Sequence, residues 1–120
     1  MQTASELLLW GIVLHLVGDW LLQNDWMAFN KMSLRHPAAW VHGGIHTALL
    51  LLIFPWPAAI VIGFTHMLID TRIPVLWWME HFKQMTVEGP HVLLVEIWLD
   101  QVMHVVVLAI AALLVAAYVL

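Results

Sequence analysis

Eight ionisable side chains recur in pairs along an otherwise apolar chain. Within each pair the spacing is i, i+4, which puts both side chains on one face of a helix, one turn apart. Imidazole nitrogen and carboxylate oxygen are the usual protein ligands of zinc, iron and manganese, and helical bundles commonly hold metals on facing helices. The pattern therefore predicts a metal site formed by His15 with Asp19, His42 with His46, His66 with Asp70, and Asp100 with His104.

The order of residues within each pair predicts two layers. If the four helices alternate in direction, an outer layer contains Asp19, His42, Asp70 and Asp100. One turn deeper, an inner layer contains His15, His46, His66 and His104. Eight ligands exceed the four of a tetrahedral zinc site, so two metals, or one metal with outer Asp–His hydrogen bonds, both fit. We expect a divalent metal, with zinc preferred over iron or manganese.

The composition indicates that these pairs lie within a membrane. The chain has 120 residues, of which 63% are hydrophobic and 10% charged, whereas soluble domains average roughly 25% charged residues. An ionised aspartate at bilayer depth costs roughly 2.5–3.5 kcal/mol on insertion scales. The ionisable pairs should therefore face one another, and a divalent cation would offset the charge of the three aspartates most directly, because removal from water disfavours charged imidazoles.

Several functional classes conflict with the composition. The sequence contains no cysteine, which excludes disulfides, thiolate metal sites and cysteine nucleophiles. Its four Lys and Arg residues are scattered, so no nucleic-acid partner is expected. The expected partner is the lipid bilayer, and the lipid-facing surface leaves room for protein partners or a homo-oligomer.

Four apolar segments are predicted to be membrane helices, since about 20 residues cross a bilayer. A turn at Pro55-Trp56-Pro57 should separate the second and third segments, and Pro74 should kink the third. The polar stretch 24–36 carries aromatic residues and is expected to lie on the membrane surface. The predicted fold is an all-α, integral membrane four-helix bundle with this short interfacial segment. It forms a single domain over residues 1–120, with helices at 5–23, 37–54, 58–78 and 93–118.

The basic residues predict an orientation. All four lie in or near the two connections on one side of the predicted bundle: Lys31, Arg35, Arg72 and Lys83. The positive-inside rule places these connections in the cytoplasm and both termini outside. The first apolar segment has no basic stretch before it and contains ionisable residues, so we expect a retained helix rather than a cleaved signal peptide.

Several polar residues are expected at the periphery of the site. Gln101 should point about 100° away from its neighbour Asp100 on the helix. Lys31 and Arg72 would bind an anionic headgroup or neutralise a carboxylate. The remaining histidines are expected in loops or at the interface: His36, His81 and His91.

Two motifs in the chain resemble those of a known family. The segment His15-Leu-Val-Gly-Asp19-Trp-Leu-Leu-Gln23 and the later Asp100-Gln101-Val-Met-His104 are similar to the pattern of the bacterial membrane family called domain of unknown function 3307. The resemblance covers nearly the whole chain and implies a multi-pass protein of the bacterial inner membrane without an established activity. More distantly, the His-x3-Asp helices look like those of families labelled membrane-bound metal-dependent hydrolases.

Two functions of different classes fit these residues. An enzyme would be a metal-dependent hydrolase of a lipid-like or amphiphilic substrate, with Asp19 or Glu96 taking the proton of a metal-bound water. A non-enzyme would be an accessory or scaffold subunit of a larger membrane complex, with a structural metal or a polar hydrogen-bond network. Proton or metal transport is a third function, but the apolar stretches 49–54 and 105–115 offer no polar path across the bundle.

Overall fold

The computed structural model describes residues 2–86 and 88–118, and these residues form helices, turns and loops without a β-strand. Residues 1, 119 and 120 of the predicted domain lie outside the described residues. The elements in chain order are α1 (Ala4–Leu16), η1 (Val17–Leu21), α2 (Asp25–Asn30), α3 (Pro37–Leu50), α4 (Trp56–Asp70), α5 (Ile73–Trp77), η2 (Trp78–Phe82) and α6 (Val92–Tyr118), where η denotes a π-helix.

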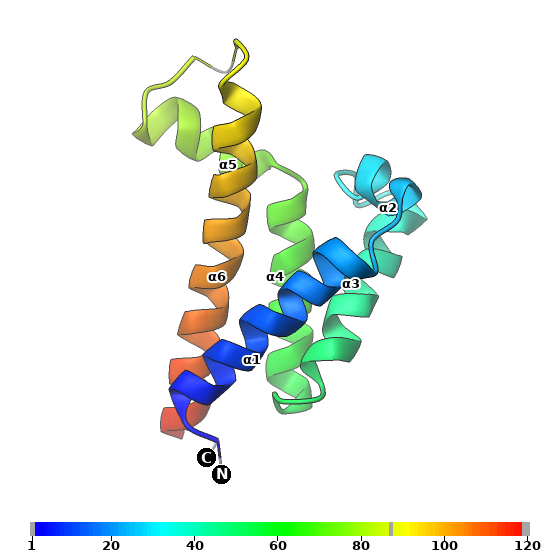
Figure 1. The fold of residues 1–120 in the computed structure, drawn as a ribbon, viewed down its shortest axis with the longest axis vertical. Helices are drawn as coiled ribbons and strands as arrows, with labels where there is room; N and C mark the ends of the chain where they lie inside the picture. The colour runs from blue at the N-terminus through cyan, green and yellow to red at the C-terminus, as the bar shows by residue number, and fades with distance from the viewer. Residues whose placement is uncertain (1, 87, 119–120) are drawn as a thin grey trace.

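The helices form a bundle with the described termini at one end and short helices at the other (Figure 1). Helices α3 and α4 pack side by side, and α1 runs obliquely across the bundle and contacts both α3 and α6. The start of α1 and the end of α6 lie at one end of the molecule, whereas α2 and α5 lie toward the other. The predicted interfacial segment thus contains a short helix, α2, at the end of the bundle opposite the described termini.

The first predicted helix is present, but its last residues form a π-helix instead of an α-helix. Thr3 caps it, since its hydroxyl accepts a hydrogen bond from the Glu6 amide while the Glu6 carboxylate accepts one from the Thr3 amide. From Val17 the chain is a π-helix, closed by a hydrogen bond from the Leu22 amide to the Val17 carbonyl. The π-helix ends at Leu21, two residues before the predicted end, and its buried residues are Gly18 and Asp19. Such π segments often occur at functional sites.

The second helix is shorter than predicted. It begins at Pro37, as expected, with the His36 ring accepting a hydrogen bond from the Ala38 amide, but it ends at Leu50 instead of residue 54. The chain then tightens into i→i+3 turns, and Pro55 disfavours helix in the residue before it. At 1.5 Å per residue, the 14 residues of α3 extend about 21 Å, which is less than the roughly 30 Å of a hydrocarbon core.

The third predicted helix, 58–78, is interrupted, and the kink predicted from Pro74 is present as a break between two helical segments. Helix α4 begins two residues earlier, at Trp56, and the chain bends by 58° between Asp70 and the segment Ile73–Phe82. The break lies at Arg72, which has a left-handed backbone with φ of 67°, and not at Pro74 itself. A proline ring clashes with the carbonyl four residues earlier, here that of Asp70, and lacks an amide proton to bond it. The helix therefore ends at Asp70, and Pro74 occupies the first turn of α5, where proline is tolerated.

Two helical segments are long and apolar enough to cross a membrane, Ala4–Leu21 and Val92–Tyr118, and the bent pair of α4 with Ile73–Phe82 makes a third if it counts as one span. The outer surface fits a lipid environment, because large side chains such as Leu9, Val61 and Leu113 are 59–65% exposed. These features are consistent with a membrane protein. The prediction of four spanning helices stays a prediction, since α3 is too short to be a span by itself.

The interior has an apolar region on each side of a polar layer. One region lies toward the described termini and includes Leu7, Phe54 and Leu108. The other lies toward α5 and includes Val75 and Met79. The ionisable residues on α4 and α6 lie between these regions along each helix. The apolar side chains fix the separation of the helices, which in turn fixes how the polar side chains meet.

Glycines permit the close contacts of this bundle. A Cβ atom on Gly63 would overlap the hydroxyl of Thr47 on the neighbouring α3, and that hydroxyl is held by a hydrogen bond to the Gly43 carbonyl. A Cβ atom on Gly18 would lie 2.6 Å from the His46 ring. Small residues at such positions let membrane helices approach closely.

We predict that Gly63→Ala lowers the free energy of unfolding by about 1–3 kcal/mol, because the added methyl group over-packs the α3–α4 contact. Gly44→Ala is the matched control, since a Cβ atom there meets nothing within 4 Å, and it should stabilise the helix by up to about 1 kcal/mol. Thermal unfolding of both variants in detergent micelles measures the difference. Equal stabilities would contradict this packing.

Candidate functional site

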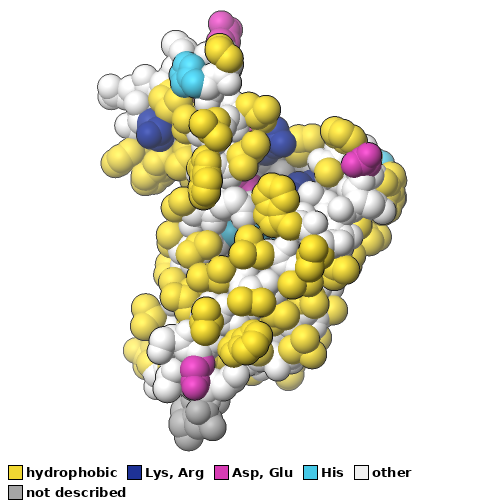
Figure 2. All heavy atoms as spheres, viewed as in Figure 1, with side chains coloured by type: hydrophobic (Ala, Val, Ile, Leu, Met, Phe, Trp, Pro, Cys, Tyr) yellow, Lys and Arg dark blue, Asp and Glu magenta, His cyan; other side chains and the backbone are white. Residues whose placement is uncertain are grey.

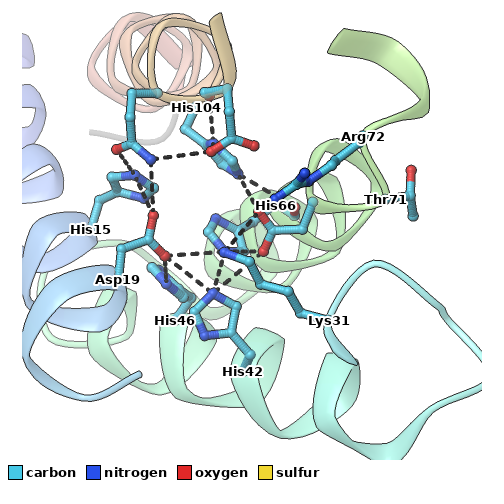
Figure 3. Close-up of polar contacts among 12 residues, drawn as sticks. His15, Asp19, Lys31, His42, His46, His66, Thr71, Arg72 and His104 are labelled. Atoms are coloured by element: carbon cyan, nitrogen blue, oxygen red, sulfur yellow. Dashed lines mark hydrogen bonds and ion pairs between the residues drawn. The ribbon is translucent and has the colours of Figure 1, made fainter. Parts of the chain in front are cut away.

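Seven of the eight predicted site residues meet in one buried cluster (Figure 3). Helix α1 and η1 supply one pair, α3 and α4 supply two more, and α6 supplies a single histidine. All seven side chains are buried, although the surrounding helices expose apolar residues. We call this group the His/Asp cluster, and it consists of His15, Asp19, His42, His46, His66, Asp70 and His104.

Asp19 is the first centre of the cluster. Its Oδ1 atom accepts a hydrogen bond from His46 Nε2 at 2.9 Å and lies 3.1 Å from His42 Nε2. Its Oδ2 atom lies 3.3 Å from His15 Nε2. The π-helical turn carries this carboxylate into the bundle, and the absence of a side chain on Gly18 lets the His46 ring pack against it.

Asp70 is the second centre. Its Oδ2 atom lies 2.9 Å from His66 Nε2 and 3.4 Å from His42 Nε2. Its Oδ1 atom lies 3.5 Å from His104 Nε2 and 3.7 Å from the Lys31 ammonium. Neither oxygen accepts a well-formed hydrogen bond. A buried carboxylate with only ionic contacts is incompletely compensated.

The imidazole rings of the cluster face one another at short range. His46 and His66 stack with their centroids 3.8 Å apart, and the centroids of His66 and His104 are 4.2 Å apart. The Nε2 atoms of His42 and His66 are only 3.1 Å apart, so both cannot carry a proton that points at the other. At least one of these two nitrogens therefore presents its lone pair to the other ring.

Two overlapping sets of these residues have the spacing of metal ligands. In one set, Asp19, His42, His46 and His66 each offer one donor atom, and these atoms lie within 4.8 Å of one another. The second set is His66, Asp70 and His104. Ligands of a tetrahedral zinc ion at bond lengths of 2.0–2.1 Å lie about 3.3 Å from each other. The Nε2–Nε2 distance of 3.1 Å and the Asp19 contacts are close to that value.

Asp100, the eighth predicted ligand, lies at the edge of the cluster and in neither set. Its side chain is 18% exposed, and its carboxylate lies 3.5 Å from His104 Nδ1. Glu96, predicted as a proton acceptor, lies one turn away and forms an ion pair of 2.8 Å with Arg72. The peripheral histidines lie outside the cluster: His36 caps α3, and His81 and His91 are exposed.

Gln101 joins the two sides of the site, which the helical spacing did not predict. Its Oε1 atom accepts a hydrogen bond from His15 Nε2 at 3.1 Å. Its amide nitrogen donates to Asp19 at 3.2 Å and to Asp100 at 3.1 Å. The residue was expected to point away from Asp100, but α1 packs obliquely against α6 and meets the Gln101 side chain. Only the packing of these two helices could have identified it.

The cluster borders a cavity. This cavity, of about 160 Å³, lies between the cluster and the surface and is lined by three groups of residues. The acidic side chains come from η1, α4 and α6, and the amide side chains are Gln23, which follows η1, and Gln101. The basic side chains are Lys31 and Arg72, and the apolar ones include the exposed Trp20 and Ile97. Figure 2 shows basic side chains bordering a hollow in which acidic and histidine side chains are visible. A second, smaller void of about 10 Å³ is lined by four histidines of the cluster and by aliphatic side chains.

Comparison with known proteins assigns the chain to a family. The model of the family described as protein of unknown function (DUF3307) matches residues 7–120. The chain therefore belongs to this family, as its motifs predicted. The match includes every residue of the His/Asp cluster. No curated protein and no solved structure matches the sequence.

We predict that Gln101→Ala destabilises the chelator-treated protein by about 1–3 kcal/mol, because its loss removes hydrogen bonds from buried His15 and Asp19. Gln23→Ala is a matched control, since the buried Oε1 atom of Gln23 has no hydrogen-bond partner. Unfolding in detergent micelles provides the measurement. A Gln23→Ala effect as large as that of Gln101→Ala would show that the bridging bonds contribute little.

Proposed function

We propose that this chain is a membrane-embedded, metal-dependent hydrolase that acts on a lipid-like or amphiphilic substrate. One observation carries the proposal: two overlapping sets of buried His and Asp donors border a cavity of about 160 Å³. Such a site can hold a cation, admit water and receive part of a substrate. The family match gives no activity, so the argument rests on the chemistry of the residues.

The donor types favour zinc, with iron or manganese as other candidates. Asp19, His42, His46 and His66 would form the first metal site. Asp70 and His104 would hold a second ion with His66 or complete the surroundings of the first. A divalent ion would compensate the two buried carboxylates, of which Asp70 has no hydrogen-bond partner.

A bound metal would lower the pKa of a coordinated water toward neutrality and supply the nucleophile. A nearby carboxylate must then accept the proton. Asp19 is a candidate ligand, and Glu96 is held by Arg72. Asp100 lines the cavity, belongs to neither ligand set and is not paired with a Lys or Arg in the described part of the chain, so we assign it the role of proton acceptor.

The proposed membrane arrangement has four packed helices, with α3 held inside the bundle by its neighbours although it is short. The two basic connections would face the cytoplasm of a bacterial inner membrane, following the positive-inside rule. Trp20 and Ile97, exposed at the rim of the cavity, would then contact lipid near the cytoplasmic interface. This position suits a substrate that enters from the membrane.

A second candidate is a non-catalytic scaffold or accessory subunit. The observation in its favour is that several cluster residues already contact one another, as in the hydrogen bond between His46 and Asp19. A polar network of this kind can fix helix packing without turnover. The scaffold would present a closed coordination shell, whereas the hydrolase needs a position occupied by water.

We predict that the protein purified without chelator contains at least one equivalent of divalent metal. His66→Ala should weaken metal binding at least about 10–100-fold, the range for loss of a partner of a metal ligand, because His66 belongs to both donor sets. Elemental analysis after gel filtration measures the metal content. His91→Ala is the matched control, since this exposed histidine lies outside the cluster.

Metal-free wild-type protein, after equilibration with zinc, iron and manganese salts, would overturn the proposal. Two further variants distinguish the donor sets. Asp19→Asn should weaken metal binding at the first set, and His104→Ala should weaken it at the second. Cobalt substitution then distinguishes the two functions. An absorption spectrum that changes when a water ligand is displaced supports the hydrolase, and an unresponsive spectrum supports the scaffold.

A further inference from the structure

We infer that the cavity beside the His/Asp cluster binds the phosphate group of a membrane amphiphile, and that this phosphate ester is the bond the protein hydrolyses. The inference rests on the proposed function and specifies its substrate class. It depends on two cations, an unusual backbone conformation, the charge of the cavity and the apolar rim.

Two cations from distant parts of the chain reach the cavity. Lys31 follows α2, and its side chain is only 14% exposed, although its single ion pair with Asp70 is long, at 3.7 Å. Arg72 lies at the break between α4 and α5 and contacts Glu96 through Nη1. Figure 3 shows both side chains extending toward the cluster from the same side. A guanidinium has five donors in a planar fork that matches a phosphate group.

Arg72 occupies a backbone conformation that favours glycine. Its φ of 67° is left-handed, a region that other L-residues rarely adopt. Glycine would satisfy the bend without strain, yet an arginine stands at the position and lines the cavity. Strained residues of this kind concentrate at ligand-binding sites, which supports a binding role for the guanidinium.

The charge of the cavity makes anion binding depend on metal. Its lining includes four carboxylates, Asp19, Asp70, Glu96 and Asp100, but only the two cations Lys31 and Arg72. Without metal the excess of negative charge repels phosphate. One divalent ion balances the charges, and a second makes the cavity positive. A metal on Asp70 would also release Lys31 from its ion pair, so metal and phosphate should each strengthen the binding of the other.

The rim of the cavity favours an amphiphile as the source of the phosphate. Trp20 and Ile97 are 67% and 41% exposed on the side of η1 and α6, where an attached apolar chain would pass into the lipid. The cavity, at about 160 Å³, accommodates a headgroup but not an acyl chain. Its lining combines charged and amide side chains with the exposed apolar side chains of Trp20 and Ile97, and the two parts of an amphiphile require both kinds.

The reaction is the hydrolysis of a phosphomonoester. A metal held by the His/Asp cluster would activate a water, whose oxygen would form a bond to phosphorus as the bond from phosphorus to the ester oxygen breaks. The water proton would pass to Asp100 and from Asp100 to the departing alkoxide, which becomes the lipid alcohol. The products are inorganic phosphate and the alcohol, with no change of oxidation state. Arg72 and Lys31 would stabilise the charge on the phosphoryl oxygens.

We predict that inorganic phosphate binds the zinc-loaded protein at least tenfold more tightly than the metal-free protein in isothermal titration calorimetry. Arg72→Gln and Lys31→Gln should each weaken this binding about tenfold, since each removes a charged hydrogen-bond donor. Lys83→Gln removes the same charge from an exposed position away from the cavity and should leave phosphate binding unchanged. Arg72→Lys should recover part of the binding.

Two further measurements identify the source of the phosphate. Phosphatidate in mixed micelles should compete at lower concentrations than inorganic phosphate and release phosphate on incubation, while a fatty acid in the same micelles should not compete. Equal competition by free phosphate and phosphatidate would refute an amphiphile as the source of the phosphate. Unchanged phosphate binding in both Arg72→Gln and Lys31→Gln, with wild-type metal content, would overturn the binding site.

The two proposals fail in different ways. A zinc-loaded protein that cleaves a carboxylic ester amphiphile but does not bind phosphate would refute this inference and leave the hydrolase intact. A protein that binds no metal would refute the hydrolase, and with it the phosphate site. Metal content, measured on every variant, separates these results from a failure to fold.

Discussion

The burial of two carboxylates inside an apolar bundle is the constraint on which the structure depends. Asp19 and Asp70 are each nearly inaccessible to solvent, and an isolated charge in such surroundings is strongly unfavourable. Five histidines and one lysine gather around them. The apolar regions on each side keep the helices at the separation that these contacts require. The surface exposes many large apolar side chains, while these ionisable side chains are buried between two apolar core regions.

The sequence predicted the cluster well because the spacing that defines it is local. A residue pair at i, i+4 shares a face of any helix, whatever the helix packs against. Burial then brings such faces together, which is why seven of the eight residues meet. Asp100 shares a face of α6 with His104, but its carboxylate lies at the edge of the cluster, 3.5 Å from His104 Nδ1.

Helix ends and contacts between helices were predicted less well because they depend on the tertiary structure. Pro74 predicted a kink in the third helix, but the exact residue at which the helix ends, Asp70, was seen only in the structure. The π-helical turn around Asp19 leaves no recognisable mark in the sequence. The hydrogen bonds from Gln101 to His15 and Asp19 depend on how α1 packs against α6, so spacing along α6 alone placed Gln101 at the periphery without identifying its partners.

The place where α4 ends has an electrostatic consequence of its own. Asp70 is the last residue of that helix, and Asp19 lies within the last turn before η1 ends at Leu21. The carbonyl groups of a final turn carry the negative end of the helix dipole, equivalent to roughly half an elementary charge. Both helix ends lie beside the cavity, whose lining includes Asp19 and Asp70. The backbone itself therefore creates a potential that attracts cations there, before any side chain is considered.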